Sequence, residues 1–384
     1  MGCEREEEVT TKILVLSVMH DRRRFWRTTR LMEFWQVSKH SPRIRRSERD
    51  AVSLLLLAAL ILAPACQQLP SVPAETRRGT IRGVTLVDWS PTGYGRPQAD
   101  SALQSIVSTG ASHIAVIVTA YQKNPFSNTV RFDSLRTPSV TAIRHVLHSA
   151  AGLGLKTTMK PHVDIDDGSW RGYINPPNPD SWFASYRSFI LPLASLAESL
   201  GVAQFIVGTE LASTISSSGE WMETIARVRS VFSGSIIYAA SWDEAARVPF
   251  WIQLDYVGVN FYFPVAQRTD PGRFEIFAGW QPWIERLHLL QNLAGKRIIL
   301  TEIGYRSVDG AGLRPYDFTS NPPLDLQEQA DLYWAAMQAI ADQEWIEGLY
   351  WWDWRADGTG GPLNKDFTPA GKPAQLELEK SWNP

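Results

Sequence analysis

Cysteine is nearly absent from this chain: Cys3 and Cys66 are the two cysteines in 384 residues. Both precede the region with a globular pattern, so a disulfide framework, a thiol nucleophile and cysteine metal sites are excluded from that region. A Gly-x-Ser-x-Gly nucleophile elbow is also missing. No cluster of His, Asp and Glu has the spacing of metal ligands, so we expect no metal site.

An excess of charge of one sign is missing as well, since 38 Lys and Arg face 40 Asp and Glu for a net charge of −2. A nucleic-acid partner is therefore not expected, because no basic excess is available to neutralise phosphates. Apolar and aromatic residues are plentiful, with 44% hydrophobic residues and 16 Trp. This content suffices for a sizeable core, and those Trp rings that are not part of the core present faces on which sugars stack.

Residues 1–80 have the pattern of an export segment and a tether. Four basic residues precede the apolar run 52–63: Arg43, Arg45, Arg46 and Arg49. The run is too short to span a bilayer permanently, and the pattern predicts a secretory signal over 1–65. A start at Met32 would give this signal a more usual length. Residues 66–80 are then a tether, followed by one domain over 81–384.

The Ala65-Cys66 ending resembles a bacterial lipoprotein signal. In such signals the cysteine becomes the acylated first residue of the mature chain. The resemblance implies a lipid anchor at Cys66 and an exported lipoprotein at the cell surface or in the periplasm, and ordinary secretion is the alternative.

Short apolar runs alternate with amphipathic stretches from Ile81 onward. The predicted strands are 83–88, 113–119, 156–162, 205–208, 235–240, 256–260, 297–302 and 348–352. The predicted helices are 98–109, 138–151, 180–200, 219–231, 244–253, 280–294, 326–342 and 374–381. Eight such units predict an α/β fold, a single-domain (β/α)8 TIM barrel. An open doubly wound sheet would need a Gly-rich loop after its first strand, and residues 88–91 do not provide one.

Two of the predicted strands lead to a glutamate at their carboxyl ends, in the segments Phe205–Glu210 and Arg297–Glu302. In a parallel barrel the carboxyl ends of the strands carry the chemistry, and paired carboxylates are the working groups of glycosidases. We expect the Tyr262 hydroxyl to donate to Glu302 and favour its ionised form, and a drier setting to raise the pKa of Glu210. Glu210 is therefore predicted as acid/base and Glu302 as nucleophile. A structural salt bridge is the alternative for either residue alone.

Polar and aromatic residues gather at the other predicted strand ends and in the loops that follow them. The candidates for binding sugar are Trp89, Lys160, His162, Trp170, Arg171, Trp242, Asn260, Tyr262 and Trp352. Since neighbouring residues of a strand point in opposite directions, Trp351 is expected to be buried behind the barrel when Trp352 faces the substrate. The acidic loop at 164–167 is predicted to line the sugar site in preference to binding calcium.

Several separated motifs resemble glycoside hydrolase family 113. They are Lys160-Pro-His162, Gly168–Gly172, Val207–Leu211, Thr301–Tyr305 and Tyr350–Trp354. The resemblance implies hydrolysis of β-1,4-mannan with net retention and no cofactor. It also implies that Glu210 is the acid/base and Glu302 the nucleophile. Many members of the wider clan have Asn before the acid/base, whereas this chain has Thr209.

The predicted function is a retaining glycoside hydrolase that cleaves β-1,4-mannosidic bonds in mannan or manno-oligosaccharides. Two alternatives stand beside it: a retaining β-glycosidase acting on another β-glycan, and a surface lipoprotein that binds carbohydrate without cleaving it. The presence of both Glu210 and Glu302 argues against the second alternative, because a binding protein needs no ionised nucleophile.

Overall fold

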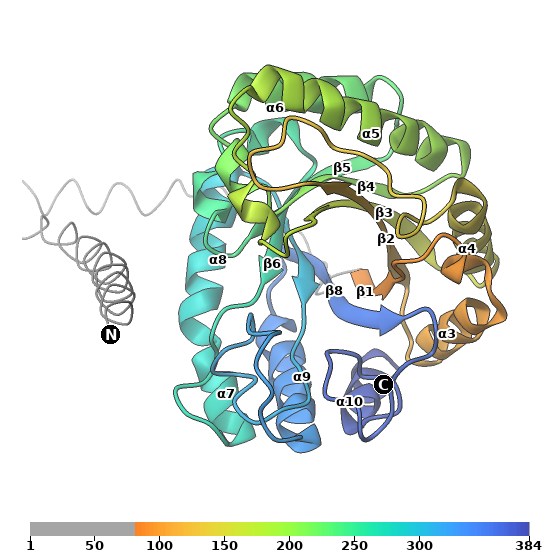
Figure 1. The fold of residues 1–384 in the computed structure, drawn as a ribbon. Helices are drawn as coiled ribbons and strands as arrows, with labels where there is room; N and C mark the ends of the chain where they lie inside the picture. Colours follow the sequence, from red (N-terminus) through yellow and green to blue (C-terminus); the bar gives the residue numbers. More distant parts are fainter. Residues whose placement is uncertain (1–80, 384) are drawn as a thin grey trace, which may run out of the picture. The chain divides into compact units, whose positions relative to one another are not determined.

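The computed structural model describes residues 81–383, and eight parallel strands in these residues close into a barrel surrounded by helices (Figure 1). The predicted (β/α)8 fold is thus confirmed. The predicted signal over 1–65, the tether over 66–80 and Cys66 lie outside the described residues. Among residues 81–383, no helix is long and apolar enough to cross a membrane.

Every strand pairs with its neighbours in chain order, and β8 closes the barrel against β1. The strands are β1 Ile81–Val87, β2 His113–Gln122, β3 Lys156–Ile165, β4 Gln204–Thr209, β5 Ser235–Ser241, β6 Tyr256–Phe261, β7 Ile298–Ile303 and β8 Ile346–Arg355. Each lies where a strand is predicted. Strands β2, β3 and β8 are three residues or more longer than predicted, because the pairing continues through polar residues such as Gln122, Asp164 and Arg355.

Helices cover the outside of the barrel. They are α3 Pro97–Ser108, α4 Val140–Gly152, α5 Pro179–Ser199, α6 Ser218–Arg229, α7 Arg273–Gly279, α8 Gln281–Ala294, α9 Leu326–Ile340 and α10 Pro373–Trp382. Three of them begin at side-chain caps: Ser139, Asn178 and Asp325 accept the backbone N–H of Ala142, Ser181 and Glu328. Such caps satisfy backbone donors that the first helical turn leaves free.

One helix prediction needs correction. The helix predicted over 244–253 is wrong, since the structure has two 3-10 turns there, Ala245–Arg247 and Trp251–Gln253. Pro249 explains the break, because the residue before a proline avoids the helical region, and Val248 is extended at φ −68° and ψ 117°. The structure also adds α7, seven residues for which the sequence analysis predicts no helix.

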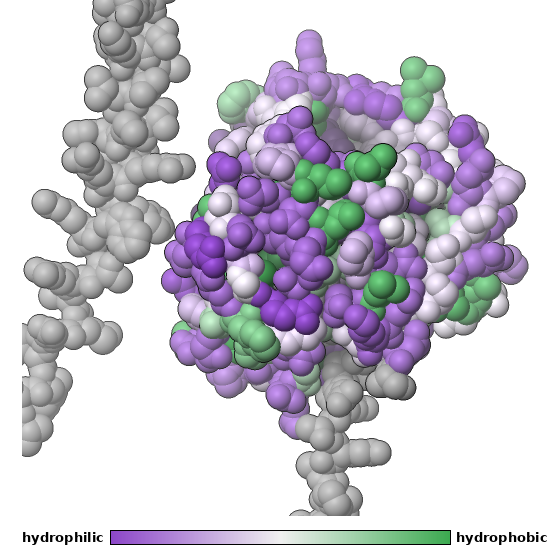
Figure 2. All heavy atoms as spheres, turned by 90° about the horizontal axis from the view of Figure 1, so that it is seen from below, coloured by the Kyte–Doolittle hydropathy of each residue, from purple (hydrophilic) through white to green (hydrophobic). Residues whose placement is uncertain are grey.

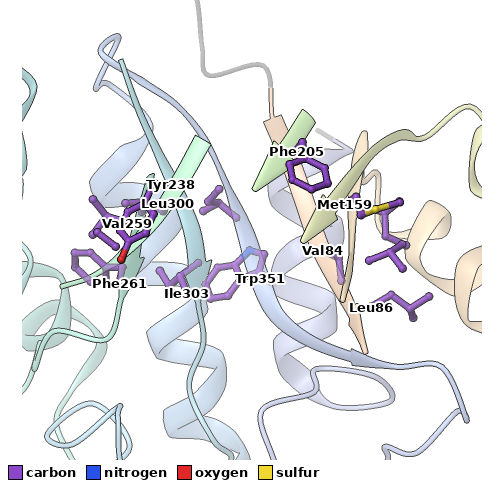
Figure 3. Packing of buried hydrophobic residues seen from close by; sticks show 14 of the residues in the cluster. Val84, Leu86, Met159, Phe205, Tyr238, Val259, Phe261, Leu300, Ile303 and Trp351 are labelled. Atoms are coloured by element: carbon purple, nitrogen blue, oxygen red, sulfur yellow. The ribbon is translucent and has the colours of Figure 1, made fainter. Parts of the chain in front are cut away.

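The main core lies between the barrel and the helices. Figure 3 shows side chains of several strands that contribute to it, among them Phe205 of β4, Met159 of β3 and Trp351 of β8. Trp351 is fully buried and stacks on Tyr333 of α9, with ring centroids 3.7 Å apart. The prediction that Trp351 faces away from the barrel interior is therefore confirmed.

A smaller core fills the barrel itself, as is usual in this fold. Its buried members are Ile81, Ala115, Ile206, Ile237, Ala239, Ile299 and Tyr350. The Tyr350 hydroxyl lies 2.7 Å from Thr158 Oγ1 and donates to Gln204 Oε1 at 2.7 Å. One side chain of β8 thereby joins β3 and β4 across the barrel.

The face shown in Figure 2 is mostly hydrophilic, with hydrophobic residues in small separated groups. Scattered apolar residues are normal on the surface of a folded domain. This face therefore has no continuous apolar patch. In a parallel barrel the active site is expected at the carboxyl ends of the strands.

Candidate active site

The side chains predicted to act on sugar come from, or closely follow, every strand except β2, and two lie in the loop after β3. Lys160 and His162 lie on β3, and Glu210 directly follows β4. Asn260 lies on β6, Glu302 on β7 and Trp352 on β8. Apart from Lys160, which lies at the middle of β3, they are in the carboxyl-terminal halves of their strands or directly follow them, and parallel strands of a closed barrel bring these ends together.

Glu302 is almost fully buried, with 4% of its surface exposed, and each carboxylate oxygen has a donor. Lys160 Nζ donates to Oε1 at 2.6 Å, and the Tyr262 hydroxyl donates to Oε2 at 2.9 Å. A cation and a hydroxyl donor both stabilise the charged form of a carboxylate. The setting of Glu302 therefore suits an ionised group.

Lys160 lies beneath this carboxylate and is 1% exposed. Its ammonium also donates to the Thr301 carbonyl at 2.9 Å. Burial lowers the pKa of Lys160, whereas the charge of Glu302 raises it. Lys160, predicted as a sugar contact, thus makes its hydrogen bonds within the protein and supplies the countercharge of Glu302.

Glu210 has a different environment. The Trp170 indole Nε1 donates to Glu210 Oε2 at 3.1 Å. Burial raises the pKa of Glu210, and the charge of Glu302 raises it further. Arg171, Asn260 and Trp170 lower this pKa, and the net direction is upward. A raised pKa keeps a carboxylic acid protonated where an ordinary glutamate is ionised.

Arg171 links the loop after β3 to the site. Its Nη1 donates to His162 Nδ1 at 2.8 Å, and its Nη2 pairs with Asp164 Oδ1 at 2.6 Å. Since Nδ1 accepts, the proton of a neutral His162 is on Nε2. Burial lowers the pKa of His162 well below its usual range, and the charges of Arg171 and Lys160 act in the same direction.

His162 Nε2 lies 3.7 Å from Glu302 Oε1, and within the described part of the chain it has no hydrogen-bond partner. The Trp352 ring stacks on His162, with centroids 6.0 Å apart and planes at 10°. An N–H donor and a partly exposed indole face beside a buried carboxylate match the polar and apolar sides of a sugar ring.

Of the other predicted sugar contacts, Asn260 is held by a hydrogen bond to the neighbouring strand, whereas two Trp residues pack against other side chains. Asn260 is buried and accepts from the Thr301 hydroxyl at 2.9 Å, so its position on β6 is fixed. Trp89 packs under the Arg355 guanidinium, and Trp242 packs against Phe263. The two Trp residues have no described contact with either Glu.

Thr209 precedes Glu210, where many clan members have Asn. Its hydroxyl donates to the Pro161 carbonyl at 3.3 Å, and the side chain is 2% exposed. Thr209 therefore packs inside the protein and does not provide an exposed polar group there.

Glu244, near Glu210, is not among the residues predicted from the sequence, and the partner of Asp164 is not predicted either. Glu244 is fully buried and accepts from the Tyr238 hydroxyl at 2.7 Å. An acidic residue in an amphipathic segment normally lies on its solvent face, so no sequence pattern distinguishes Glu244 from a surface residue. Asp164, the partner of Arg171, appeared in the sequence only as part of an acidic loop.

Gly172 allows Trp170 to reach Glu210, because a Cβ at position 172 would overlap the Trp170 ring. We expect Gly172→Ala to displace this indole and lower kcat/KM by about 10- to 100-fold, as small misplacements at a reacting centre do. Steady-state kinetics measure the effect. Gly219→Ala is the matched control, since a Cβ there meets nothing within 4 Å. Equal kinetics of the two variants would contradict the role given to Trp170.

The model of glycoside hydrolase family 113 matches residues 87–372. Among solved structures, a family 113 β-1,4-mannanase is 26% identical, with a TM-score of 0.73, over 79% of this chain and 98% of that chain. The β-mannanase AaManA from Alicyclobacillus acidocaldarius, in complex with ManMIm, is 25% identical, with a TM-score of 0.74, over 80% of this chain and 98% of that one.

A β-glucuronidase from Faecalibacterium prausnitzii shares the fold at 12% identity and a TM-score of 0.53, over 79% of this chain and 48% of that chain. Comparison with curated protein sequences found no match. The family model spans most of the barrel, including the segments that carry Lys160, Glu210, Glu302 and Trp352. The chain therefore belongs to glycoside hydrolase family 113 and is a glycoside hydrolase.

Proposed function

We propose that the protein hydrolyses β-1,4-mannosidic bonds in mannan or manno-oligosaccharides, with retention of anomeric configuration. Glu302 is the nucleophile and Glu210 the acid/base. The observation that carries the proposal is the contrast between the two carboxyl groups, one paired with the buried Lys160 ammonium and the other with a raised pKa. The family 113 structures similar to this chain are β-mannanases, which supports mannan as the substrate class.

In the first step a Glu302 oxygen attacks the anomeric carbon while Glu210 gives its proton to the departing glycosidic oxygen. The bond from carbon to the leaving sugar breaks, and an ester to Glu302 forms. Tyr262 and Lys160 hold the attacking carboxylate in place. The partly exposed Trp352 face offers a stacking surface to the sugar bound at this point, and the buried His162 Nε2–H lies behind it beside Glu302.

In the second step Glu210 removes a proton from water, which attacks the anomeric carbon and displaces Glu302. The change of role follows from electrostatics. Because the charge of Glu302 raises the pKa of Glu210, forming the ester removes that charge and lowers the pKa. Glu210 is thus an acid before the ester forms and a base afterwards.

The anomer released first and the preferred glycan test the proposal. Mannohexaose, xylohexaose and cellohexaose are incubated with the protein, and proton NMR follows the first product. We expect cleavage of the mannan oligomer with the β-anomer formed first. An α-anomer formed first would exclude retention, and cleavage restricted to xylo- or gluco-oligomers would exclude mannan.

The raised pKa of Glu210 predicts a pH dependence that varies with the leaving group. The acid must be protonated, so kcat/KM on mannohexaose is expected to fall as pH rises through this pKa, at higher pH than for an ordinary glutamate. Dinitrophenyl β-mannoside needs no protonation of its leaving group and should lack this alkaline fall. Identical pH profiles for the two substrates would contradict the assignment of Glu210.

A further inference from the structure

The backbone at the end of β4 has an unusual conformation where it presents Glu210. Glu210 has φ +53°, in the left-handed region that residues other than glycine rarely adopt. The pairing of β4 with β5 also shifts register between Ile206 and Gly208. A bulge re-aims the side chains that follow it, and backbone in a sparsely populated region persists only when its surroundings fix it.

Two hydrogen bonds hold this turn. The Glu210 N–H donates to the Ala239 carbonyl at 2.8 Å, and the Leu211 N–H donates to the Tyr238 hydroxyl at 3.0 Å. The first bond is part of the pairing with β5. The second bond is made by a side chain, so it can be removed without changing the backbone.

Tyr238 is itself fixed. Its ring is fully buried between β5 and the outer helices, 5.2 Å from the ring of Trp221 and 5.4 Å from that of Phe250. A Cβ at Gly208 would lie 2.9 Å from this ring, so the glycine permits the close approach of β4. The hydroxyl can therefore move little, and its oxygen stays beneath the Leu211 amide.

Glu244 completes the chain of hydrogen bonds by accepting the Tyr238 proton at Oε1, at 2.7 Å. Its Oε2 is buried and has no hydrogen-bond partner within residues 81–383. Burial raises the pKa of Glu244 to about 8; the charges of Glu210 and Asp243 raise it too, whereas Tyr238 and Arg247 lower it. An uncharged carboxyl that accepts through one oxygen is the form that suits this site at neutral pH.

We propose that Tyr238 and Glu244 are positioning residues that hold the Glu210 turn in the orientation needed for proton transfer to the leaving group. The inference rests on the proposed role of Glu210 as acid/base. Neither residue contacts the substrate. Tyr238 acts through the Leu211 amide, and Glu244 acts by directing the Tyr238 proton away from that amide so that the hydroxyl oxygen accepts.

Leaving-group dependence separates positioning from loss of fold. Tyr238→Phe removes the hydroxyl and keeps the ring, so the turn loses one of its two bonds. We expect kcat/KM on mannohexaose to fall by about 10- to 100-fold, as for a displaced catalytic group. We expect kcat/KM on dinitrophenyl β-mannoside to change less than about twofold, because that leaving group needs no acid.

Tyr94→Phe is the matched control. The Tyr94 hydroxyl is also buried and donates to backbone carbonyls, those of Leu86 and Ile117, and it is not part of the Glu210 turn. The Tyr94→Phe variant should lose stability as Tyr238→Phe does. Any change in its kcat/KM should be the same on mannohexaose and on dinitrophenyl β-mannoside. An equal loss on both substrates in Tyr238→Phe, or no loss on either, would overturn the inference.

Glu244 gives a second test that does not depend on the folding of Tyr238→Phe. Glu244→Gln keeps the acceptor oxygen without a charge and should match wild type at neutral pH. Glu244→Ala removes the acceptor and should show the selective loss on mannohexaose. The inference fails if Glu244→Ala is unselective or if Glu244→Gln does not restore activity.

Glu210→Gln distinguishes this failure from failure of the proposed function. If Glu210→Gln lowers kcat/KM on mannohexaose and keeps kcat/KM on dinitrophenyl β-mannoside, Glu210 is the acid, since kcat/KM reports the step in which the leaving group departs. The Tyr238 and Glu244 variants then decide the inference alone. If Glu210→Gln lowers kcat/KM on both substrates by the same factor, the assignment of Glu210 as acid is wrong. The inference about Tyr238 and Glu244 is then wrong as well.

Discussion

Glu302→Gln is expected to lower kcat/KM on mannan by about 10⁴-fold or more, as removal of a nucleophile does in other hydrolases. The amide has nearly the same shape as the carboxylate but cannot form the ester. Its NH₂ group also faces either Lys160 Nζ or the Tyr262 hydroxyl, where the carboxylate accepts two hydrogen bonds. Release of reducing ends from mannan measures the loss.

The exposed Glu223 on α6 is the control, because it pairs with Arg227 at the surface and Glu223→Gln should leave activity unchanged.

Azide identifies the role of the missing group. With dinitrophenyl β-mannoside, azide attacks Glu302→Ala from the vacated face and gives the α-mannosyl azide. In Glu210→Ala it attacks the ester and gives the β-azide. Exchange of these two products would reverse the assignments of Glu302 and Glu210.

Lys160→Met is expected to cost about 3–5 kcal/mol of unfolding free energy, because it leaves the Glu302 carboxylate buried without its cation. Methionine keeps most of the volume, so packing loss is small. Activity at neutral pH should fall by about 100-fold or more, since the nucleophile loses a preorganised donor and its charged form becomes less favourable. Urea unfolding and mannan hydrolysis measure the two effects.

A double-mutant cycle isolates the electrostatic cause. Lys160→Met with Glu302→Gln removes both charges and should unfold with a higher free energy than Lys160→Met alone. Lys380→Met is the control, since its ion pair with Glu377 is at the surface and contributes about 1 kcal/mol or less. A double variant no more stable than Lys160→Met would mean that Lys160 acts through packing.

The sequence located every strand because buried parallel strands are apolar on both faces. Segments such as 205–208 and 235–240 are short apolar runs that end in turns. The segment 244–253 has the apolar spacing of a helix, but Pro249 interrupts it and leaves two 3-10 turns. Strand ends were less predictable, since Asp164 of β3 and Arg355 of β8 continue the pairing although they are charged.

Strand alternation predicts on which face of its strand each site residue lies. It does not predict which residues those side chains form hydrogen bonds with. Lys160 and His162 share a face of β3, but the sequence cannot distinguish a lysine that binds sugar from one buried under Glu302. That distinction depends on a strand 142 positions later in the chain. The link from Leu211 to Tyr238 and Glu244 was hidden for the same reason, since it joins β4 to β5 across their outer side.

The Tyr350 bridge across the barrel bears on how the enzyme first acquires activity. Thr158 and Gln204 meet their partner Tyr350 only when the eighth strand has docked. Contacts between residues so distant in sequence form late and slowly. During refolding from urea, hydrolysis of mannan should therefore recover in step with this final docking and not with the earlier gain of helical circular dichroism.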